Sequence, residues 1–203
     1  TMTPELTAAT GMDALCHAFE AFVSTASSPL TDIAALASVR LIRENLIGAY
    51  RHPADRTYRN NMMMASLMAG LAFSNPSLGF VHAMAHSLGG ALGLAHGECN
   101  AILLEEVIRY NYASCAEKYD QIANAMGLHV GNCESSQKAS MLAEHVASLR
   151  KQLSITQRLG AMGVSLSDLP RLAGHAFDDP CLATNPRTAT PEDIEKIYAS
   201  IYQ

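Results

Sequence analysis

Residues Gly79–Cys99 read GFVHAMAHSLGGALGLAHGEC, and this stretch decides how the rest of the chain is interpreted. His82 and His86 lie four positions apart, so on a helix they share one face and are separated by one turn. The three glycines between residues 89 and 93 allow the backbone to turn, so that His96 can come back toward the pair. The stretch therefore predicts a helix that ends in the glycine cluster and a following segment that folds back beside it.

Helical periodicity continues on both sides of this stretch. Apolar residues recur at intervals of three and four through nearly the whole chain, and no alternating β pattern of convincing length interrupts them. No flexible linker, low-complexity tract or fixed repeat divides the chain. We therefore predict a single all-α domain spanning residues 1–203. Its helices are expected at about 6–25, 29–50, 55–73, 76 to the glycine cluster, beyond 97 to 110, 113–126, 135–153, 167–177 and 191–202.

The composition limits the classes of function. The 203 residues carry 14 Lys plus Arg against 19 Asp plus Glu, a net charge of -5, and 49% of them are hydrophobic. This apolar fraction is sufficient for a buried core. A mildly acidic chain without runs of basic residues lacks the electrostatic footprint that binds a nucleic-acid backbone. The methionines of the third helix, Met62, Met63, Met64 and Met68, are expected to fill the core together with Leu67 and Leu71.

Cysteine usage and hydropathy indicate a cytoplasmic location. The cysteines stand at positions 16, 99, 115, 133 and 181, an odd and scattered set without CxxC spacing, which suits a reducing compartment. No leader pattern opens the chain, and no apolar run reaches the roughly 18 residues that cross a bilayer. The opening Thr1-Met2-Thr3-Pro4 is unlike a native start, so we expect the chain to be a fragment.

A second group of chemically active side chains lies near the start of the chain. Asp13 and His17 are four positions apart, and Glu20 follows one turn later on a mostly apolar helix. Such side chains must be paired, solvated or metal-bound, because burying a lone ion is expensive. Carboxylate and imidazole together suit zinc or ferrous iron, whereas calcium prefers more oxygens. Spacing alone leaves a metal site and ordinary hydrogen-bonded roles both open.

A phosphate-binding glycine loop is not evident in the sequence. Such a loop places its glycines between a strand and a helix. The glycines at 89–93 follow a predicted helix instead. They give no support to a dinucleotide-binding fold within this chain.

Two long motifs resemble the signatures of the iron-containing (group III) alcohol dehydrogenases. Thr7–Glu20, TAATGMDALCHAFE, resembles the first, and Gly79–Cys99 resembles the second without insertion or deletion. Cys181–Arg187, CLATNPR, resembles the segment near the family's C-terminus, so the resemblance covers essentially the whole chain. Enzymes of this family combine an N-terminal nucleotide-binding α/β domain with a helical, dehydroquinate synthase-like domain that holds a divalent metal in the cleft. The resemblance implies that this chain is the helical metal-binding domain, without the nucleotide-binding domain and inactive alone.

The resemblance also implies a set of metal ligands. They are Asp13, His17, His82 and His96, and the ion implied is Fe²⁺, with Zn²⁺ as an alternative. A bound ion acts as a Lewis acid while hydride passes between a small primary alcohol or its aldehyde and NAD or NADP. The missing domain is expected to hold most of the nicotinamide cofactor and to decide between NAD and NADP.

Four further residues carry weaker implications. His86 resembles the family's histidine beside the nicotinamide, with a role in proton relay or cofactor placement. Phe73 and Cys181 occupy positions that resemble substrate-pocket residues, although core packing explains each equally well. Glu98 stands where the family more often has an apolar residue. One interpretation is that its negative charge stabilises the first turn of a helix. The other is that it alters the environment of the metal ligands.

Two other functions remain open on the sequence. One is a metal enzyme similar to glycerol dehydrogenase or dehydroquinate synthase. The resemblance favours the iron-type alcohol dehydrogenases over the glycerol dehydrogenases, because His17 would be a fourth protein ligand and the glycerol dehydrogenases use three. The other is a helical interaction domain without catalysis. The expected partners are a small alcohol or aldehyde and the missing domain, with a homo-oligomer as a further option and with neither nucleic acid nor a membrane.

Overall fold

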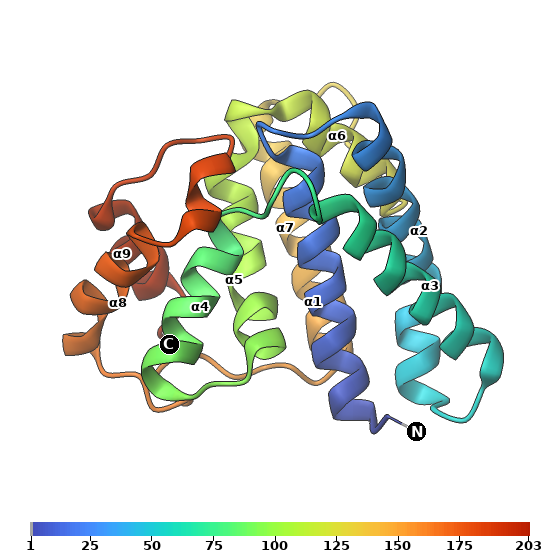
Figure 1. The fold of residues 1–203 in the computed structure, drawn as a ribbon, viewed down its shortest axis with the longest axis horizontal. Coiled ribbons are helices and arrows are strands. Elements are labelled where there is room, and N and C mark those ends of the chain that lie inside the picture. The colour runs from blue at the N-terminus through green and yellow to red at the C-terminus, as the bar shows by residue number, and fades with distance from the viewer. Residues whose placement is uncertain (1) are drawn as a thin grey trace.

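The computed structural model describes residues 2–203, and in these residues it contains nine α-helices, three short 3-10 helices and no β-strand. The predicted all-α class is confirmed. Figure 1 shows α1 in the middle of the molecule, α2 and α3 on one side of it, α4 and α5 on the other, and α8 and α9 at the far end. The α-helices are α1 Pro4–Val23, α2 Pro29–Arg51, α3 Arg56–Phe73, α4 Phe80–Leu92, α5 His96–Asn111, α6 Ala116–Ala125, α7 Ser135–Gln152, α8 Leu169–Phe177 and α9 Pro191–Ser200.

Side-chain caps explain where several helices begin. Thr3 accepts a hydrogen bond from the Leu6 amide at the start of α1, and Ser28 forms a capping box before Pro29 at the start of α2. Such caps satisfy backbone N–H groups that have no partner inside the helix, and proline suits the first helical position. Thr190 begins α9 in the same way. These starts fall within two residues of those expected from the sequence.

Some predicted boundaries were wrong. Helix α4 begins at Phe80 rather than near Pro76, because Ser77 has a φ of 62°, a left-handed conformation that a right-handed helix cannot include. Gly93 alone makes the turn after α4, at a φ of 67°, while the two earlier glycines of the cluster are still helical. The segment expected as one helix from 113 to 126 is a 3-10 turn at 112–114 followed by α6.

The third helix packs through its small residues rather than its large ones. Ala65, Ala69 and Ala72 are the buried residues of α3, since alanines allow close approach to α1 and α2. The expected methionine core is wrong here. The large residues of the opposite face are exposed to solvent, namely Met63, Met64, Leu67 and Leu71, while Met62 and Met68 are half-buried.

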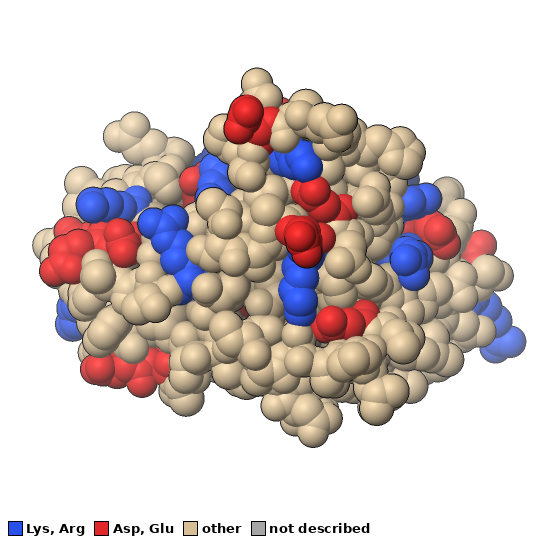
Figure 2. Space-filling view, turned by 90° about the horizontal axis from the view of Figure 1, so that it is seen from above, with Lys and Arg blue, Asp and Glu red and all other residues tan. Residues whose placement is uncertain are grey.

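Charged side chains of both signs are mixed on the face of the molecule that Figure 2 shows, without a continuous basic patch on that face. Among residues 2–203, none of the helices combines the length and the apolar character needed to span a membrane.

The contact between α1 and α5 leaves no room for a side chain at Gly97. A Cβ atom there would lie 2.4 Å from the backbone oxygen of Ala9 and 2.8 Å from its carbonyl carbon. Both are backbone atoms, so a rotamer change could not relieve the overlap. Gly97 follows His96 and therefore sets how closely the start of α5 approaches α1.

We expect Gly97→Ala to destabilise the chain by about 1–3 kcal/mol, because overpacking forces the two backbones apart. Thermal and urea unfolding would measure the change. Gly90→Ala is the matched control, since a Cβ at Gly90 meets nothing within 4 Å. Equal stability of the Gly97→Ala and wild-type chains would contradict the close approach of α1 and α5.

Candidate metal centre

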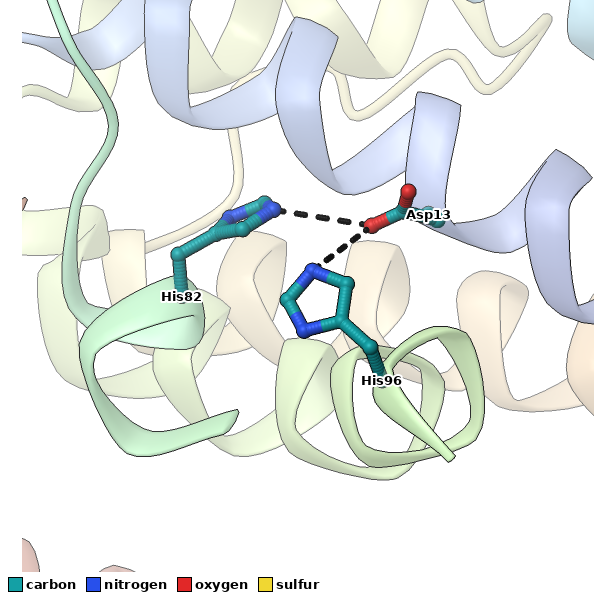
Figure 3. A group of neighbouring side chains, drawn as sticks. All are labelled: Asp13, His82 and His96. Carbon is teal, nitrogen blue, oxygen red and sulfur yellow. Dashed lines mark ion pairs between the residues drawn. The ribbon is translucent and has the colours of Figure 1, made fainter. Parts of the chain in front are cut away.

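Three helices bring one carboxylate and two imidazoles together. Asp13 comes from the middle of α1, His82 from the first turn of α4 and His96 from the first residue of α5. The Asp13 Oδ1 atom lies 3.5 Å from His82 Nε2 and 3.4 Å from His96 Nε2 (Figure 3). The three atoms all lie within 4.8 Å of one another, although the residues are up to 83 positions apart in the sequence.

The spacing of these atoms fits a divalent metal ion. Four ligands arranged tetrahedrally at bonds of about 2.1 Å stand about 3.4 Å from each other. The two measured distances match this value. His82 is buried, whereas 41% of the His96 side chain is exposed, so one side of the group is open to solvent. A ligand set that is closed on one side and open on the other is typical of catalytic metal sites.

Asn100 is a member of this group that the sequence analysis missed. Its side-chain nitrogen lies 2.6 Å from Asp13 Oδ1 and 3.1 Å from the Nε2 atoms of both His82 and His96. Its side-chain oxygen is buried and has no hydrogen-bond partner among the described residues. Its position one helical turn after His96, on the same face of α5, is the signal that would have identified it.

His17 lies beside the group and not within it. Its ring stacks between Phe73, at a centroid distance of 4.5 Å, and His82, at 4.4 Å. His17 Nδ1 lies 3.8 Å from Asp13 Oδ2. The structure thus brings together three of the four ligands expected from the resemblance and places the fourth next to them. The stacking also places Phe73, one of the two expected pocket residues, at the edge of the site.

Hydrogen bonds and burial shift the pKa values of this group in opposite directions. Burial alone would raise the pKa of Asp13, but the hydrogen bonds to His82 and His96 outweigh it and hold that pKa well below its usual range. For His82, burial acts to lower the pKa, but the contacts with Asp13 and Glu20 raise it to about 9. Burial and the neighbouring His82 lower the pKa of His17 to about 4. Asp13 is therefore an ionised carboxylate and His17 a neutral imidazole at neutral pH.

A second cluster adjoins the first. His86 Nδ1 lies 2.9 Å from Asp179 Oδ2, and Asp179 Oδ1 accepts a hydrogen bond of 2.8 Å from the Cys181 amide. The His86 ring stacks on His96 with a centroid distance of 5.4 Å. The structure therefore brings the expected residues His86 and Cys181 together, and it adds Asp179, which the sequence analysis missed.

Glu98 takes the position expected from the helix. It lies in the first turn of α5, where a negative charge is favourable. It lines a small pocket with Glu5 and Tyr50, and it does not belong to the group formed by Asp13, His82 and His96.

Comparison with known proteins identifies similar chains over the whole length. The profile of the Fe-containing alcohol dehydrogenase family, C-terminal, matches residues 7–202. Alcohol dehydrogenase 4 of Saccharomyces cerevisiae is 42% identical over 202 residues, which cover 100% of this chain and 52% of that protein. The 1,3-propanediol dehydrogenase of Citrobacter freundii is 42% identical over 197 residues, covering 97% of this chain and 51% of that protein.

Solved structures of similar proteins have the same fold as this chain. The crystal structure of a 1,3-propanediol oxidoreductase superposes with a TM-score of 0.96 at 40% identity, covering 100% of this chain and 53% of that one. The chain therefore spans about half the length of the relatives that it matches.

Two histidine variants would test the composition of the ligand group. We expect His82→Ala to abolish stoichiometric zinc binding, because it removes the most buried imidazole and leaves only two of the three convergent side chains, Asp13 and His96. We expect His17→Ala to bind one zinc ion about 10–100-fold more weakly, since the three convergent side chains remain in place. Isothermal titration of each variant with zinc would measure both effects.

The exposed His129 provides the control, because His129→Ala also removes one imidazole but lies outside both clusters. Wild-type affinity in His17→Ala would exclude His17 from the ligand set. Full zinc occupancy in His82→Ala would show that Asp13, His82 and His96 do not form the zinc site.

Proposed function

Since this chain belongs to the Fe-containing alcohol dehydrogenase family, as the match over residues 7–202 establishes, we propose that it is the metal-binding, catalytic domain of an NAD(P)-dependent alcohol dehydrogenase. In this proposal residues 1–203 form one domain, and a nucleotide-binding domain lies outside the chain. The convergence of Asp13, His82 and His96 at metal-ligand spacing is the observation that carries the proposal.

We propose Asp13, His17, His82 and His96 as the residues that hold the ion. Carboxylate and neutral imidazole suit both ferrous iron and zinc, and the family points to Fe²⁺ first. When bound, the ion would supply Lewis-acid polarisation of the oxygen of an alcohol or aldehyde. The negative charge of the ionised Asp13 would partly neutralise the positive charge of the ion. Because His96 is partly exposed, a small molecule could reach the ion from that side.

His86 is placed to move a proton. Its Nδ1 atom is held by Asp179, and 43% of its side chain is exposed, which leaves the Nε2 atom available on the open side of the site. An imidazole oriented by a carboxylate can relay a proton between a substrate hydroxyl and solvent. We therefore assign His86 to proton relay beside the nicotinamide ring of the cofactor.

The proposed substrate is a small primary alcohol or the corresponding aldehyde. Phe73 stacks on His17, and Cys181 lies with His86 and Asp179 in the adjoining cluster, so they are the pocket residues that we propose. The relatives include proteins named as alcohol, 1,3-propanediol and lactaldehyde enzymes, all of which act on small hydroxyl or carbonyl compounds by name. NAD or NADP would be held mainly by the other domain, which we place against the exposed His86 and His96. We also propose a cytoplasmic location, supported by the scattered cysteines.

One observation favours a second candidate. His17 lies outside the group of three ligand atoms, and a site with three protein ligands is the pattern expected of the glycerol dehydrogenase-like enzymes. In that case His17 would serve as a stacking partner of His82 rather than as a ligand.

Activity of the full-length protein that contains this chain would test the proposed function. Loaded anaerobically with Fe²⁺, it is expected to reduce small aldehydes with NADH or NADPH, whereas the 203-residue chain alone is expected to show no turnover. Asp13→Asn keeps the shape of the side chain but removes its charge, and we expect it to lose bound iron and activity together.

Oxidation of glycerol but not of simple primary alcohols would favour the second candidate. Full iron content and activity in Asp13→Asn would contradict the proposed function. Lys138→Met is a suitable control, because it also removes one charge but lies in the ion pair with Asp120, away from both clusters.

A further inference from the structure

The first turn of α4 is capped by side chains from distant parts of the chain. The N-cap residue is Gly79, which has no side chain to offer. The Phe80 amide donates to Asn185 Oδ1 at 3.3 Å, and the Val81 amide donates to Glu20 Oε1 at 2.5 Å. The His82 amide donates to Glu20 Oε2 at 3.4 Å. The N–H groups that a helix leaves unpaired at its start are thus satisfied mainly by one carboxylate from α1.

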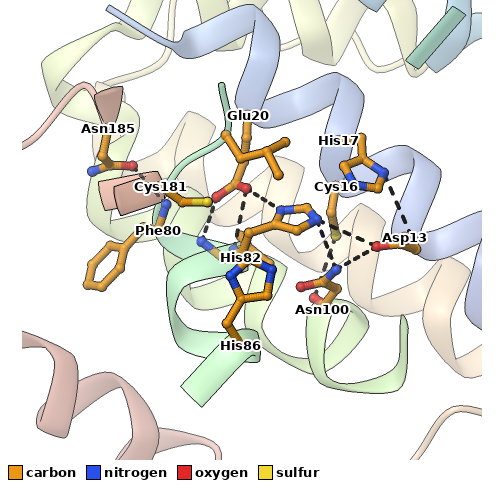
Figure 4. Close-up of polar contacts among 12 residues, drawn as sticks. Asp13, Cys16, His17, Glu20, Phe80, His82, His86, Asn100, Cys181 and Asn185 are labelled. Atoms are coloured by element: carbon orange, nitrogen blue, oxygen red, sulfur yellow. Dashed lines mark hydrogen bonds and ion pairs between the residues drawn. The ribbon is translucent and has the colours of Figure 1, made fainter. Parts of the chain in front are cut away.

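The same carboxylate holds the ring of the proposed metal ligand. Glu20 Oε2 lies 2.5 Å from His82 Nδ1 (Figure 4). The other ring nitrogen, Nε2, faces Asp13 and the rest of the ligand group. When Nδ1 carries the hydrogen and donates it to Glu20, Nε2 is left with a free lone pair for a metal ion. Glu20 therefore contacts both the backbone and the ring of His82.

The surroundings of Glu20 explain why these contacts are needed. Glu20 is 4% exposed, and among residues 2–203 no Lys or Arg lies within ion-pair distance of its carboxylate. A buried carboxylate without a partner is costly, so its stability depends on the two amides, the imidazole and the positive end of α4. A Cβ at Gly79 would lie 3.1 Å from Glu20 Oε1, which shows how closely the chain encloses the carboxylate.

We propose that Glu20 is a positioning residue for the metal centre, which orders the first turn of α4 and fixes the orientation and tautomer of His82 in a single interaction. This inference rests on the proposed metal site. It adds a residue that binds neither metal nor substrate and acts only through His82. The same contact explains why His82 can serve as a ligand while it is located in the first turn of a helix that has no cap of its own.

A glutamine cannot perform both roles of Glu20. Its amide has one acceptor oxygen and one donor NH₂ group, whereas the Val81 amide and His82 Nδ1–H are both donors and contact different oxygens of Glu20. If the NH₂ group faces the ring, Nδ1 must accept and the hydrogen moves to Nε2, which blocks the metal. If it faces Val81, the Val81 amide meets a donor instead of an acceptor, and the first turn of α4 loses its shortest capping hydrogen bond.

Zinc affinity of the 203-residue chain, measured by competition with a chromogenic chelator, would test this inference. We expect Glu20→Gln to bind zinc about 10–100-fold more weakly than the wild-type chain, as is typical when the hydrogen-bond partner of a metal-bound histidine is removed. Glu105→Gln is the matched control: Glu105 is also buried, but it pairs with Arg150 and has no contact with the ligand group. It should lose stability and keep its zinc affinity.

A spectroscopic measurement separates positioning from general stability. In the zinc-loaded wild-type chain with ¹⁵N-labelled histidine, we expect the His82 Nδ1 proton to be visible by NMR and slow to exchange with water. This signal should be absent or rapidly exchanging in Glu20→Gln. If Glu20→Gln does not fold, the spectrum of the zinc-loaded wild-type chain still tests the inference. A His82 ring that carries no hydrogen on Nδ1 in that spectrum would overturn it.

The results distinguish this inference from the proposed function. A wild-type chain that fails to bind zinc would overturn both of them. Tight zinc binding by the wild-type chain together with equal affinity in Glu20→Gln would overturn only the role of Glu20.

Discussion

The close approach of α5 to α1 is the constraint on which the site depends. Because Gly97 has no side chain, the start of α5 can lie against the backbone of Ala9 on α1. Asp13 lies one turn further along α1, so His96 comes within 3.4 Å of its carboxylate. A larger residue at position 97 would separate the two helices at the point where their ligand atoms meet.

The second constraint is electrostatic. His82 lies between two carboxylates, with Glu20 at Nδ1 and Asp13 at Nε2, and its own side chain is buried. The hydrogen bonds to these carboxylates raise the pKa of His82 even though burial acts in the opposite direction. A group of this kind carries excess negative charge when His82 is neutral, and a divalent cation at Nε2 is the natural way to balance it. The helix start at α4 and the proposed metal site therefore share the same stabilising contacts.

Much of the fold and part of the site could be predicted from the sequence. Helical periodicity and local caps such as Ser28 act over a few residues, so the pattern located most helices and several of their starts. The pairs Asp13/His17 and His82/His86 were evident for the same reason. The glycine cluster correctly placed the end of α4, although only Gly93 adopts the left-handed conformation.

The remaining features depend on contacts between distant segments. Asp179 joins the site only because the segment after α8 packs beside α4, which no local spacing reveals. The spacing of Asn100 from His96 marks it as a neighbour on α5, but its contact with His82 depends on the packing of α5 beside α4. The exposed face of α3 was predicted as core because Met and Leu are usually buried. The close packing of its alanines against α1 and α2 reversed that orientation. The stacking of His17 between Phe73 and His82 likewise depends on three separate helices.

X-ray absorption at the zinc edge of the zinc-loaded chain would test most directly the central claim that Asp13, His82 and His96 form the metal site. We expect a shell of nitrogen and oxygen atoms only, at about 2.0–2.2 Å, with the outer scattering that is typical of imidazole rings. A sulfur atom at about 2.3 Å would contradict it, because Cys181 belongs to the neighbouring cluster with His86 and Asp179 and not to this group.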